Sequence, residues 1–349
     1  MQSRICGGDP LVADLTADSE LDSAAITDFV ERAREIEREL RKTIVGQQEA
    51  VRQVLIALFA GGHVLLEGVP GLGKTLLVRT LGEVLSLRFS RIQFTPDLMP
   101  ADIVGTTIVS EDLDGRRSLR FQAGPVFANI VLADEINRAT PKTQSALLEA
   151  MQEQTVSVGE TTRPLPRPFF VLATQNPLEM EGTYPLPEAQ LDRFFFKVLV
   201  PFPRHTELEE ILRRTIRPSD AHGLQPVAHA DEVLRMLRVA REVVVAPHLV
   251  TYAVRLVLAT HPSEGSAPQA VRQYVRHGAS PRGLQALVAG AQVRALLEDR
   301  FNVSRDDLQE VALPALRHRL ILGFEAQADG ITPERIVSDV LAAVPFPRP

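Results

Sequence analysis

Residues Gly68 to Thr75 have the types and the spacing of a phosphate-binding loop. They match the pattern Gly-x-x-x-x-Gly-Lys-Ser/Thr at every fixed position. The glycines let backbone N–H groups curl around phosphate oxygens, and the helix start that follows adds partial positive charge. Lys74 is expected to reach the β- and γ-phosphates, and the Thr75 hydroxyl to bind Mg²⁺. A simple glycine-rich turn is the alternative, but an apolar strand at 64–66 and an amphipathic helix at 76–87 favour the loop.

Two adjacent carboxylates end a second apolar strand. The run Ile130 to Glu135 reads Ile-Val-Leu-Ala-Asp-Glu. Asp134 is expected to hold Mg²⁺ through water and to face Thr75, and Glu135 to accept a proton from an attacking water. A solvated strand end is the alternative reading of this pair.

Three further side chains fit the same chemistry. Asn176 follows the strand 169–174 and could orient water without adding charge, although Asn-Pro is also a turn signal. Arg193 precedes a strand, and in a ring of ATPases it could reach the γ-phosphate of the neighbouring subunit; a surface salt bridge is the alternative. Arg282 follows the helix start Ser280-Pro281, where a lid residue could reach back to phosphate; a solvated arginine is the alternative.

Composition limits the classes of protein. The chain has 349 residues, 45% of them apolar, which predicts a large domain plus a smaller one. No apolar run is long enough to span a membrane and the start lacks a signal core, so we expect a cytoplasmic protein. Cys6 is the single cysteine, which excludes disulfides within one chain, and the net charge of −6 argues against a nucleic-acid surface. The eight histidines form no ligand cluster, and His63 is expected to be structural.

Strands and helices alternate up to the run Pro201-Phe-Pro203, which predicts a mainly parallel sheet with helices on both faces. Alternating apolar residues predict one hairpin over 104–121, turning at Asp114-Gly115, and a second over 155–163, turning near Gly159-Glu160. The expected helices are 26–42, 48–60, 76–87 and 144–153, and the expected strands are 64–66, 91–94, 129–133, 169–174 and 194–200.

Beyond residue 203 the pattern is helical. Helix starts are expected at Thr206, with Glu209 in a capping box, at Ser280, at Ser304 with Asp307, and at Thr332. The predicted organisation is a disordered leader over 1–24, an α/β base domain over 25–203 and a smaller all-helical lid domain over 204–349.

Taken together, these elements resemble the AAA+ ATPases, and their details resemble the MoxR family over about residues 25 to 347. The resemblance implies a three-layer P-loop base with a parallel sheet, followed by the lid. It rests on the runs Ile44–Gln47, Gly68–Thr75, Phe121–Pro125, Leu132–Arg138, Lys142–Ser145, Leu148–Glu153, Ala173–Pro177, Glu181–Pro185 and Glu188–Arg193.

The resemblance implies ATP and Mg²⁺ as cofactors and assigns roles to single residues. Asn176 would be the first sensor, Arg193 the arginine finger and Arg282 the second sensor, while Asn137 and Arg138 would lie at a subunit interface. The metal ligands would be Thr75 and Asp134. The predicted nucleotide-binding residues are Val45, Gly46, Gly68, Val69, Pro70, Gly71, Leu72, Gly73, Lys74, Thr75 and Leu76.

The resemblance also implies an activity: a chaperone-like ATPase that hydrolyses ATP in a homo-oligomeric ring, a hexamer, to remodel or load a partner protein. Such a client often carries a von Willebrand A domain, and this family is associated with the maturation of metalloenzymes. The two hairpins would face the pore of the ring. The family usually reads Ala-Pro-Pro-Lys where this chain has Ala139-Thr-Pro-Lys142.

Two other classes of function stay open. One is a nucleotide-gated assembly switch with little turnover, against which the presence of Glu135, Asn176 and Arg193 argues. The other is a DNA motor or a chelatase-type subunit, since both use related hairpins. The first hairpin balances Arg116, Arg117 and Arg120 against Glu111, Asp112 and Asp114, so we expect no nucleic-acid partner.

Overall fold

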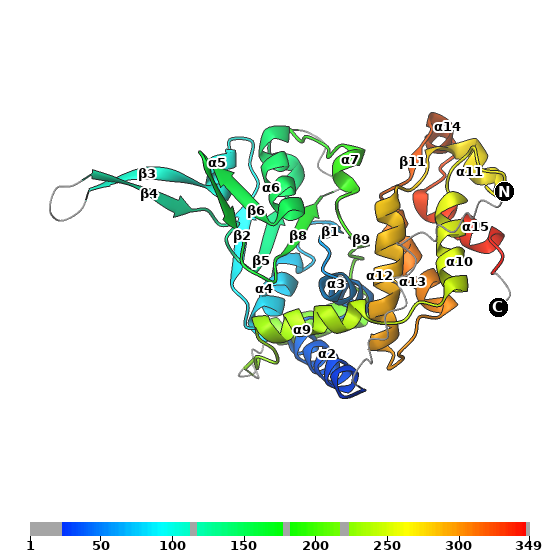
Figure 1. Cartoon of the computed structure of the whole chain (residues 1–349), viewed down its shortest axis with the longest axis horizontal. Coiled ribbons are helices and arrows are strands. Elements are labelled where there is room, and N and C mark those ends of the chain that lie inside the picture. The colour runs from blue at the N-terminus through cyan, green and yellow to red at the C-terminus, as the bar shows by residue number, and fades with distance from the viewer. Residues whose placement is uncertain (1–22, 112–116, 177–181, 217–222, 347–349) are drawn as a thin grey trace, which may run out of the picture.

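The computed structural model describes residues 23–111, 117–176, 182–216 and 223–346. Figure 1 shows a base built around a sheet on one side and a bundle of helices on the other. The expected leader lies outside the described residues, apart from Ser23 and Ala24, which are helical. The predicted boundary between base and lid at residue 203 stays a prediction.

Five parallel strands form the middle layer of the base, in the order β2-β5-β8-β1-β9. Successive side chains of a strand point to opposite faces, so Leu132 packs into one core and Val131 into the other. Both faces are buried, which explains the near-continuous apolar runs in the sequence. The strands are β1 Val64–Glu67, β2 Phe89–Gln93, β5 Ile130–Asp134, β8 Phe170–Gln175 and β9 Phe196–Leu199.

Helices cover both faces of this sheet, as the sequence predicts. Buried residues of α2 (Ser23–Thr43), α3 (Gln48–Phe59) and α4 (Lys74–Val84) share one core with the sheet. On the opposite face, α5 (Pro100–Val104) and α6 (Pro141–Glu153) pack into the second core. The base is therefore a three-layer α/β unit, and the predicted fold class is confirmed.

Both predicted hairpins are present. Strands β3 (Gly105–Glu111) and β4 (Arg117–Ala123) form an antiparallel ribbon that projects away from the base in Figure 1. The expected turn at Asp114-Gly115 lies outside the described residues. Strands β6 (Thr155–Val158) and β7 (Thr161–Pro164) form the second hairpin, and Gly159 supplies the left-handed turn conformation with a φ of 62°.

Within its described residues the lid is helical except for an isolated bridge between Val244 and Asn302 and one short antiparallel ladder, β10 (Val275–His277) with β11 (Ile321–Leu322), which the sequence analysis does not anticipate. Helix α12 packs on α2 and α3, and α13 packs on β9, so lid and base share one apolar core. The helices that follow the base are α8 His205–Ile216, α9 Ala230–Arg241, α10 Pro247–Leu258, α11 Gln269–Tyr274, α12 Pro281–Leu297, α13 Arg305–Leu316, α14 Phe324–Ala328 and α15 Pro333–Ala343.

Three of the predicted helix starts are confirmed, at Ser280, Ser304 and Thr332. The Ser280 hydroxyl accepts a hydrogen bond from the Arg282 N–H, and Ser304 and Asp307 form the expected capping box. The capping box predicted at Thr206 is wrong, because α8 begins at His205 and the capping contact lies two residues earlier than predicted. The carboxylate of Glu207 accepts instead from the N–H of Arg204, at 2.8 Å. No helix among the described residues is long and apolar enough to cross a bilayer.

Candidate active site

The loop between β1 and α4 has the geometry of a phosphate cradle. Gly71 and Gly73 take left-handed φ values of 82° and 77°, which favour glycine, and a Cβ on either would meet nothing within 4 Å. The ammonium group of Lys74 donates to the carbonyl of Gly68 at 2.5 Å and so closes the loop upon itself. The loop therefore presents an open face at the start of α4, where backbone N–H groups are free of intrahelical partners.

The segment 44–47, predicted to line the adenine pocket, lies against this loop. The side-chain amide of Gln47 donates to the carbonyl of Leu72 at 2.7 Å. Gly46 has a φ of 67°, and a Cβ there would lie 2.4 Å from the carboxyl carbon of Glu207. Helix α8, the first helix after the base, thus covers the segment at Gly46.

The predicted metal ligand Asp134 lies at the carboxyl end of β5 and is almost buried. Its carboxylate accepts a hydrogen bond of 2.6 Å from the Thr174 hydroxyl, which lies on the neighbouring strand β8. It also forms an ion pair of 2.6 Å with Arg91 of β2. Strands on both sides of β5 therefore fix the orientation of this carboxylate.

The predicted base, Glu135, is held in an unusual backbone conformation. Its φ of 56° is left-handed, and its N–H donates to the Thr174 hydroxyl at 2.8 Å. Its carboxylate accepts hydrogen bonds of 2.9 Å from Gln93 and from Arg138. Such a strained position at a strand end is typical of functional sites, where surrounding contacts enforce the conformation.

Sequence reasoning missed Arg91, Gln93 and Thr174 as partners of the two carboxylates. The available signal is the alternation of Arg91 and Gln93 around Ile92, which places both polar side chains on one side of the strand. That signal does not tell which neighbouring strand they reach, because the strand order is a long-range property.

Lys74 is close enough to both carboxylates for them to affect its charge. Partial burial lowers the pKa of Lys74, and the carboxylates of Asp134, Glu135 and Glu67 oppose that change. An ammonium group at a half-buried site beside carboxylates suits the binding of an anionic phosphate chain.

The residues present fit Mg²⁺ that arrives with a nucleotide. Thr75 is the second residue of α4, and it offers a hydroxyl beside the loop, while Asp134 offers a carboxylate. Mg²⁺ at phosphate-transfer sites typically takes one or two protein oxygens and completes its shell with phosphates and water. No group of three or more His, Cys, Asp or Glu is placed to hold a metal within the described ranges.

Asn176 follows the last residue of β8 and is buried. Strand β8 lies between β1 and β5, and its Gln175 is paired with Glu67, the residue before the phosphate loop. Because parallel strands end at the same edge of a sheet, Asn176 lies between the loop and the carboxylate pair.

Arg193 and Arg282 form a second group, on the surface of α6. Arg193 lines an open cavity of about 210 Å³, and its buried Nε has no hydrogen-bond partner in the described part of the chain. Arg282 donates to the side chain of Gln152, which lines the same cavity, at 3.4 Å. The structure thus brings the two predicted arginines together, one from the base and one from the lid.

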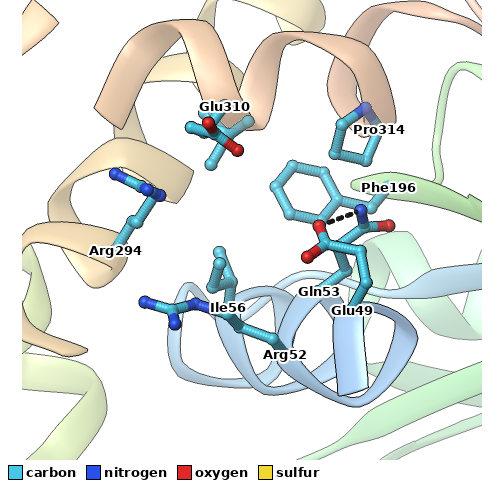
Figure 2. A pocket seen from close by; sticks show the side chains of 9 residues that line it. Glu49, Arg52, Gln53, Ile56, Phe196, Arg294, Glu310 and Pro314 are labelled. Carbon is cyan, nitrogen blue, oxygen red and sulfur yellow. Dashed lines mark hydrogen bonds between the residues drawn. The ribbon is translucent and has the colours of Figure 1, made fainter. Parts of the chain in front are cut away.

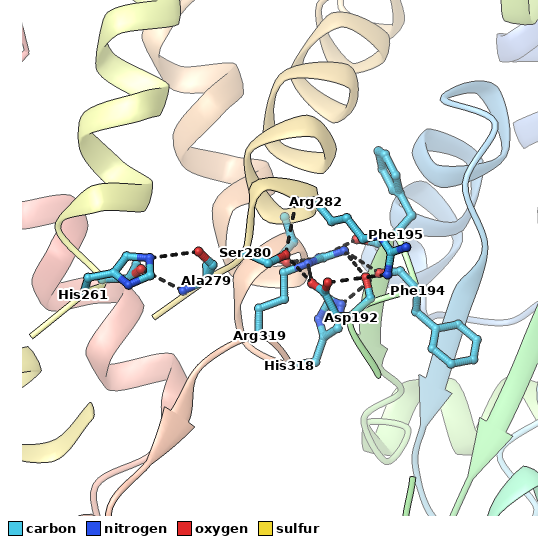
Figure 3. A network of polar contacts seen from close by, with 11 residues as sticks. Asp192, Phe194, Phe195, His261, Ala279, Ser280, Arg282, His318 and Arg319 are labelled. Atoms are coloured by element: carbon cyan, nitrogen blue, oxygen red, sulfur yellow. Dashed lines mark hydrogen bonds and ion pairs between the residues drawn. The ribbon is translucent and has the colours of Figure 1, made fainter. Parts of the chain in front are cut away.

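Asp192 connects these two arginines to the lid. Figure 3 shows its carboxylate at the centre of a polar network that joins the loop before β9 to α12 and to the end of α13. Its Oδ1 accepts from the Ser280 hydroxyl at 2.6 Å and from the Nε of Arg319 at 2.9 Å. Its Oδ2 lies 3.7 Å from the guanidinium of Arg282.

A further polar cavity, of about 100 Å³, lies between α3 and the lid helices α12 and α13 (Figure 2). It contains side chains of both charges, among them Arg52, Arg294 and Glu310, and the amide of Gln53 donates to Glu49 at 2.8 Å. None of the predicted site residues lines it.

His63 is structural, as the sequence predicts. Its Nδ1 accepts from the Val171 N–H at 3.1 Å and its Nε2 lies 3.2 Å from the Met151 carbonyl, so the neutral ring donates there. Burial lowers the pKa of His63 to about 4. The ring therefore stays neutral at ordinary pH and connects β8 to α6.

Two stretches of the chain match known protein families. Residues 63–196 match the ATPase family associated with various cellular activities (AAA), and residues 267–340 match the AAA lid domain. The first stretch contains the phosphate loop, both carboxylates, Asn176 and Arg193, and the second contains Arg282 and Arg319.

Comparison with whole proteins gives the same result. The chain is 47% identical over 311 residues to Chaperone MoxR1 of Mycobacterium tuberculosis, covering 89% of this chain and 81% of that protein. It is 34% identical over 342 residues to Protein MoxR of Methylorubrum extorquens, covering 93% and 98%. A crystal structure of a candidate ATPase from Cytophaga hutchinsonii superposes with a TM-score of 0.87 at 41% identity, covering 93% and 98%.

Proposed function

We propose that this chain, which belongs to the MoxR family of AAA+ ATPases, hydrolyses ATP in a ring of identical subunits and uses the energy to remodel a partner protein. The observation that carries the proposal is the common edge at which β1, β5 and β8 end. The phosphate loop, the Asp134–Glu135 pair and Asn176 lie there together.

Each residue at this edge has a role that its contacts support. The loop and Lys74 bind the β- and γ-phosphates, and Thr75 and Asp134 hold Mg²⁺, which neutralises charge on those phosphates when bound. Glu135 accepts a proton from the attacking water, and Asn176 orients that water. Gln93 and Arg138 both donate to Oε2 of Glu135, so they hold the carboxylate in place and leave Oε1 to take the proton.

The proposal places Arg193 and Arg282 in the ATP site of the next subunit. Arg193 lies against α6, and Gln152 of α6 and Asp192 hold the guanidinium of Arg282 there. An arginine whose Nε is unpaired in the single subunit is suited to receive a phosphate from outside.

Helix α8 supports self-association. It is amphipathic, yet none of its residues is buried, and its exposed Leu208, Ile211, Leu212 and Ile216 form a stripe at helical spacing. A row of exposed apolar residues of this kind marks a contact surface more often than a solvated face. We assign it to the ring, with a hexamer as the size that the family implies.

The two hairpins are the elements proposed to act on the client. The Arg163 guanidinium of the second hairpin lies 4.2 Å from the ring centre of Phe121 in the first, so the two are in contact. Val109 and Leu119 are paired across the first hairpin and are both exposed. They offer apolar surface to a protein client, for which a von Willebrand A domain is the class that the family implies.

One observation favours a second candidate, a nucleotide-gated switch with little turnover. The carboxylate of Glu135 forms an ion pair with Arg138, and protonation of that carboxylate would weaken the pair. In that case ATP binding alone would drive assembly.

ATP turnover measured against protein concentration separates the two candidates. The ATPase proposal expects turnover per subunit to rise with concentration, and the Glu135→Gln variant to lose about 10²- to 10⁴-fold in kcat while still binding ATP. Equal turnover by wild type and variant would favour the switch. A pull-down with Glu135→Gln and ATP should retain the client, and recovery of no second protein would weaken the remodelling proposal.

A further inference from the structure

The lid residue Arg319 lies in the turn after α13 and uses its whole hydrogen-bonding capacity on one segment of the base and on the end of α13. Its side chain is 2% exposed. Nε donates to the Asp192 carboxylate, Nη1 to the carbonyls of Phe195 and Ala315, and Nη2 to the carbonyls of Asp192 and Phe194. An arginine has five N–H donors, and all of them are accounted for here.

These acceptors lie on both sides of Arg193. The carbonyl of Asp192 is bound at 3.1 Å and that of Phe194 at 2.7 Å, so the backbone is fixed immediately before and after the finger residue. The neighbouring His318 strengthens the second contact, because its Nε2 lies 3.0 Å from the same Phe194 carbonyl. Burial lowers the pKa of His318, which keeps the ring neutral, with Nε2 as the donor.

The same network includes the start of α12. Asp192 accepts from Arg319 and Ser280 and lies beside Arg282, so one carboxylate joins the finger segment to two lid elements (Figure 3). Only a planar, five-donor cation can satisfy this set, since a lysine ammonium offers three donors from a single point. Loss of Arg319 would remove one donor from the partly buried Asp192 carboxylate and one from each of four carbonyls, which Ser280 and His318 replace only in part.

We propose that Arg319 is a positioning residue for the arginine finger: it fixes the backbone around Arg193 to the lid, so that the finger moves with the lid of its own subunit. The inference rests on the proposed function, in which Arg193 acts on the ATP of the neighbour. It goes further because it assigns the position of Arg193 to a contact with the lid residue Arg319, 126 positions later in the chain.

The test is a double-mutant cycle in the full chain, at a protein concentration where turnover per subunit no longer rises. Arg319→Met should lower kcat by roughly 100-fold, because a displaced finger stabilises the transition state poorly, while KM for ATP changes by less than about 3-fold. In the Arg193→Ala background the same substitution should change kcat by less than about 2-fold, since no finger is left to position.

Arg317→Met is the matched control. Arg317 is equally buried and lies two residues earlier, but it contacts Leu313 and Glu334, both within the lid. The Arg317→Met variant should have a lower melting temperature than the wild type, but its kcat should not fall in the way expected for Arg319→Met. If Arg319→Met fails to fold, Arg319→Lys keeps the charge with fewer donors. Its kcat should be lower than that of the wild type, but by less than the roughly 100-fold expected for Arg319→Met.

Mixing subunits gives a readout that a merely structural role would not change. Arg319→Met mixed with Glu135→Gln should regain ATPase activity. Arg319→Met supplies a pocket with an intact Glu135, and Glu135→Gln supplies a correctly positioned Arg193. Arg319→Met mixed with Arg193→Ala should not regain it, because both are defective on the finger side.

The outcomes separate the inference from the proposed function. If Arg193→Ala lowers kcat but Arg319→Met leaves it unchanged, or lowers it by the same factor with and without Arg193, the positioning role is overturned. If Arg193→Ala itself leaves kcat unchanged, Arg193 is not an arginine finger, and the inference about Arg319 is overturned as well.

Discussion

Thr174 donates a hydrogen bond of 2.6 Å to Asp134, and the same hydroxyl accepts one of 2.8 Å from the N–H of Glu135. One side chain of β8 thus fixes both the carboxylate proposed to hold Mg²⁺ and the backbone of the proposed base. Thr174 is 1% exposed, so water cannot take over either contact. The relative position of the two carboxylates depends on this hydroxyl.

Replacing Thr174 by valine keeps the shape of the side chain and removes the hydroxyl. We expect kcat for ATP to fall about 10- to 100-fold, the usual cost of losing a residue that orients a metal ligand. We also expect the free energy of unfolding to fall by about 1–3 kcal/mol, because a buried donor and a buried acceptor lose their partner. Steady-state ATPase assays and urea titration measure the two effects.

Thr143→Val is the control for this variant. Thr143 is also buried, and its hydroxyl donates to the Leu98 carbonyl at 2.7 Å, in α6 and away from both carboxylates. It should cost a similar free energy of unfolding and leave kcat near that of the wild type. Equal kcat in the two valine variants would show that Thr174 has no role in orienting the site.

Gly46→Ala should weaken ATP binding. The left-handed φ of 67° disfavours alanine by about 1–2 kcal/mol, and the new Cβ would lie 2.4 Å from the carboxyl carbon of Glu207. The side chain of Glu207 or the start of α8 must therefore move away from the segment proposed to bind adenine. Calorimetric titration with an ATP analogue should give a Kd at least about 10-fold higher.

The double variant Gly46→Ala/Glu207→Ala removes the close contact but keeps the strained backbone. It should regain part, not all, of the affinity. An unchanged Kd in Gly46→Ala would mean that this segment does not contribute to nucleotide binding.

His63 should make stability depend on pH. Its pKa is about 4 in the folded chain, because burial disfavours the charged ring, against about 6.5 when unfolded. Between these values the unfolded chain binds a proton that the folded chain does not, so stability falls as the pH drops from 6.5 to 4. The 2.5-unit difference corresponds to about 3 kcal/mol at most.

The measurement is the urea midpoint at pH 7 and pH 5 in wild type, His63→Gln and the exposed-residue control His277→Gln. His63→Gln should lose less stability on acidification than the wild type does. His318 acts in the same direction and is present in all three proteins, so its contribution cancels. If all three proteins lose the same stability, protonation of His63 does not oppose folding.

Much of the base was predictable because its local signals agree. Apolar runs end in polar residues at Asp134 and Asn176, and the phosphate loop lies between a strand and a helix, so a parallel sheet with one functional edge follows. The helix starts at Ser280 and Ser304 were equally local, since a cap is decided within four residues. The capping contact at the start of α8 was placed two residues too late, because Glu207 and Glu209 both offer a carboxylate there.

The remaining features depend on pairs of residues far apart in the chain. Nothing near Arg319 indicates that it binds the segment around Arg193, and nothing near Arg91 indicates that it pairs with Asp134. The β10–β11 ladder is too short to give an alternation pattern. The sequence could therefore predict the chemistry of the site but not the contacts that hold its parts in place.

The central claim, that the ATP site is completed by the next subunit, is tested most directly by mixing two inactive variants. Arg193→Ala keeps Glu135, and Glu135→Gln keeps Arg193, so each alone should lose at least about 100-fold in ATP turnover. In an equal mixture about a quarter of the interfaces combine an intact Glu135 with an intact neighbouring Arg193. ATPase activity near a quarter of the wild-type value is the predicted result. Activity no higher than that of the separate variants would contradict a finger that acts between subunits.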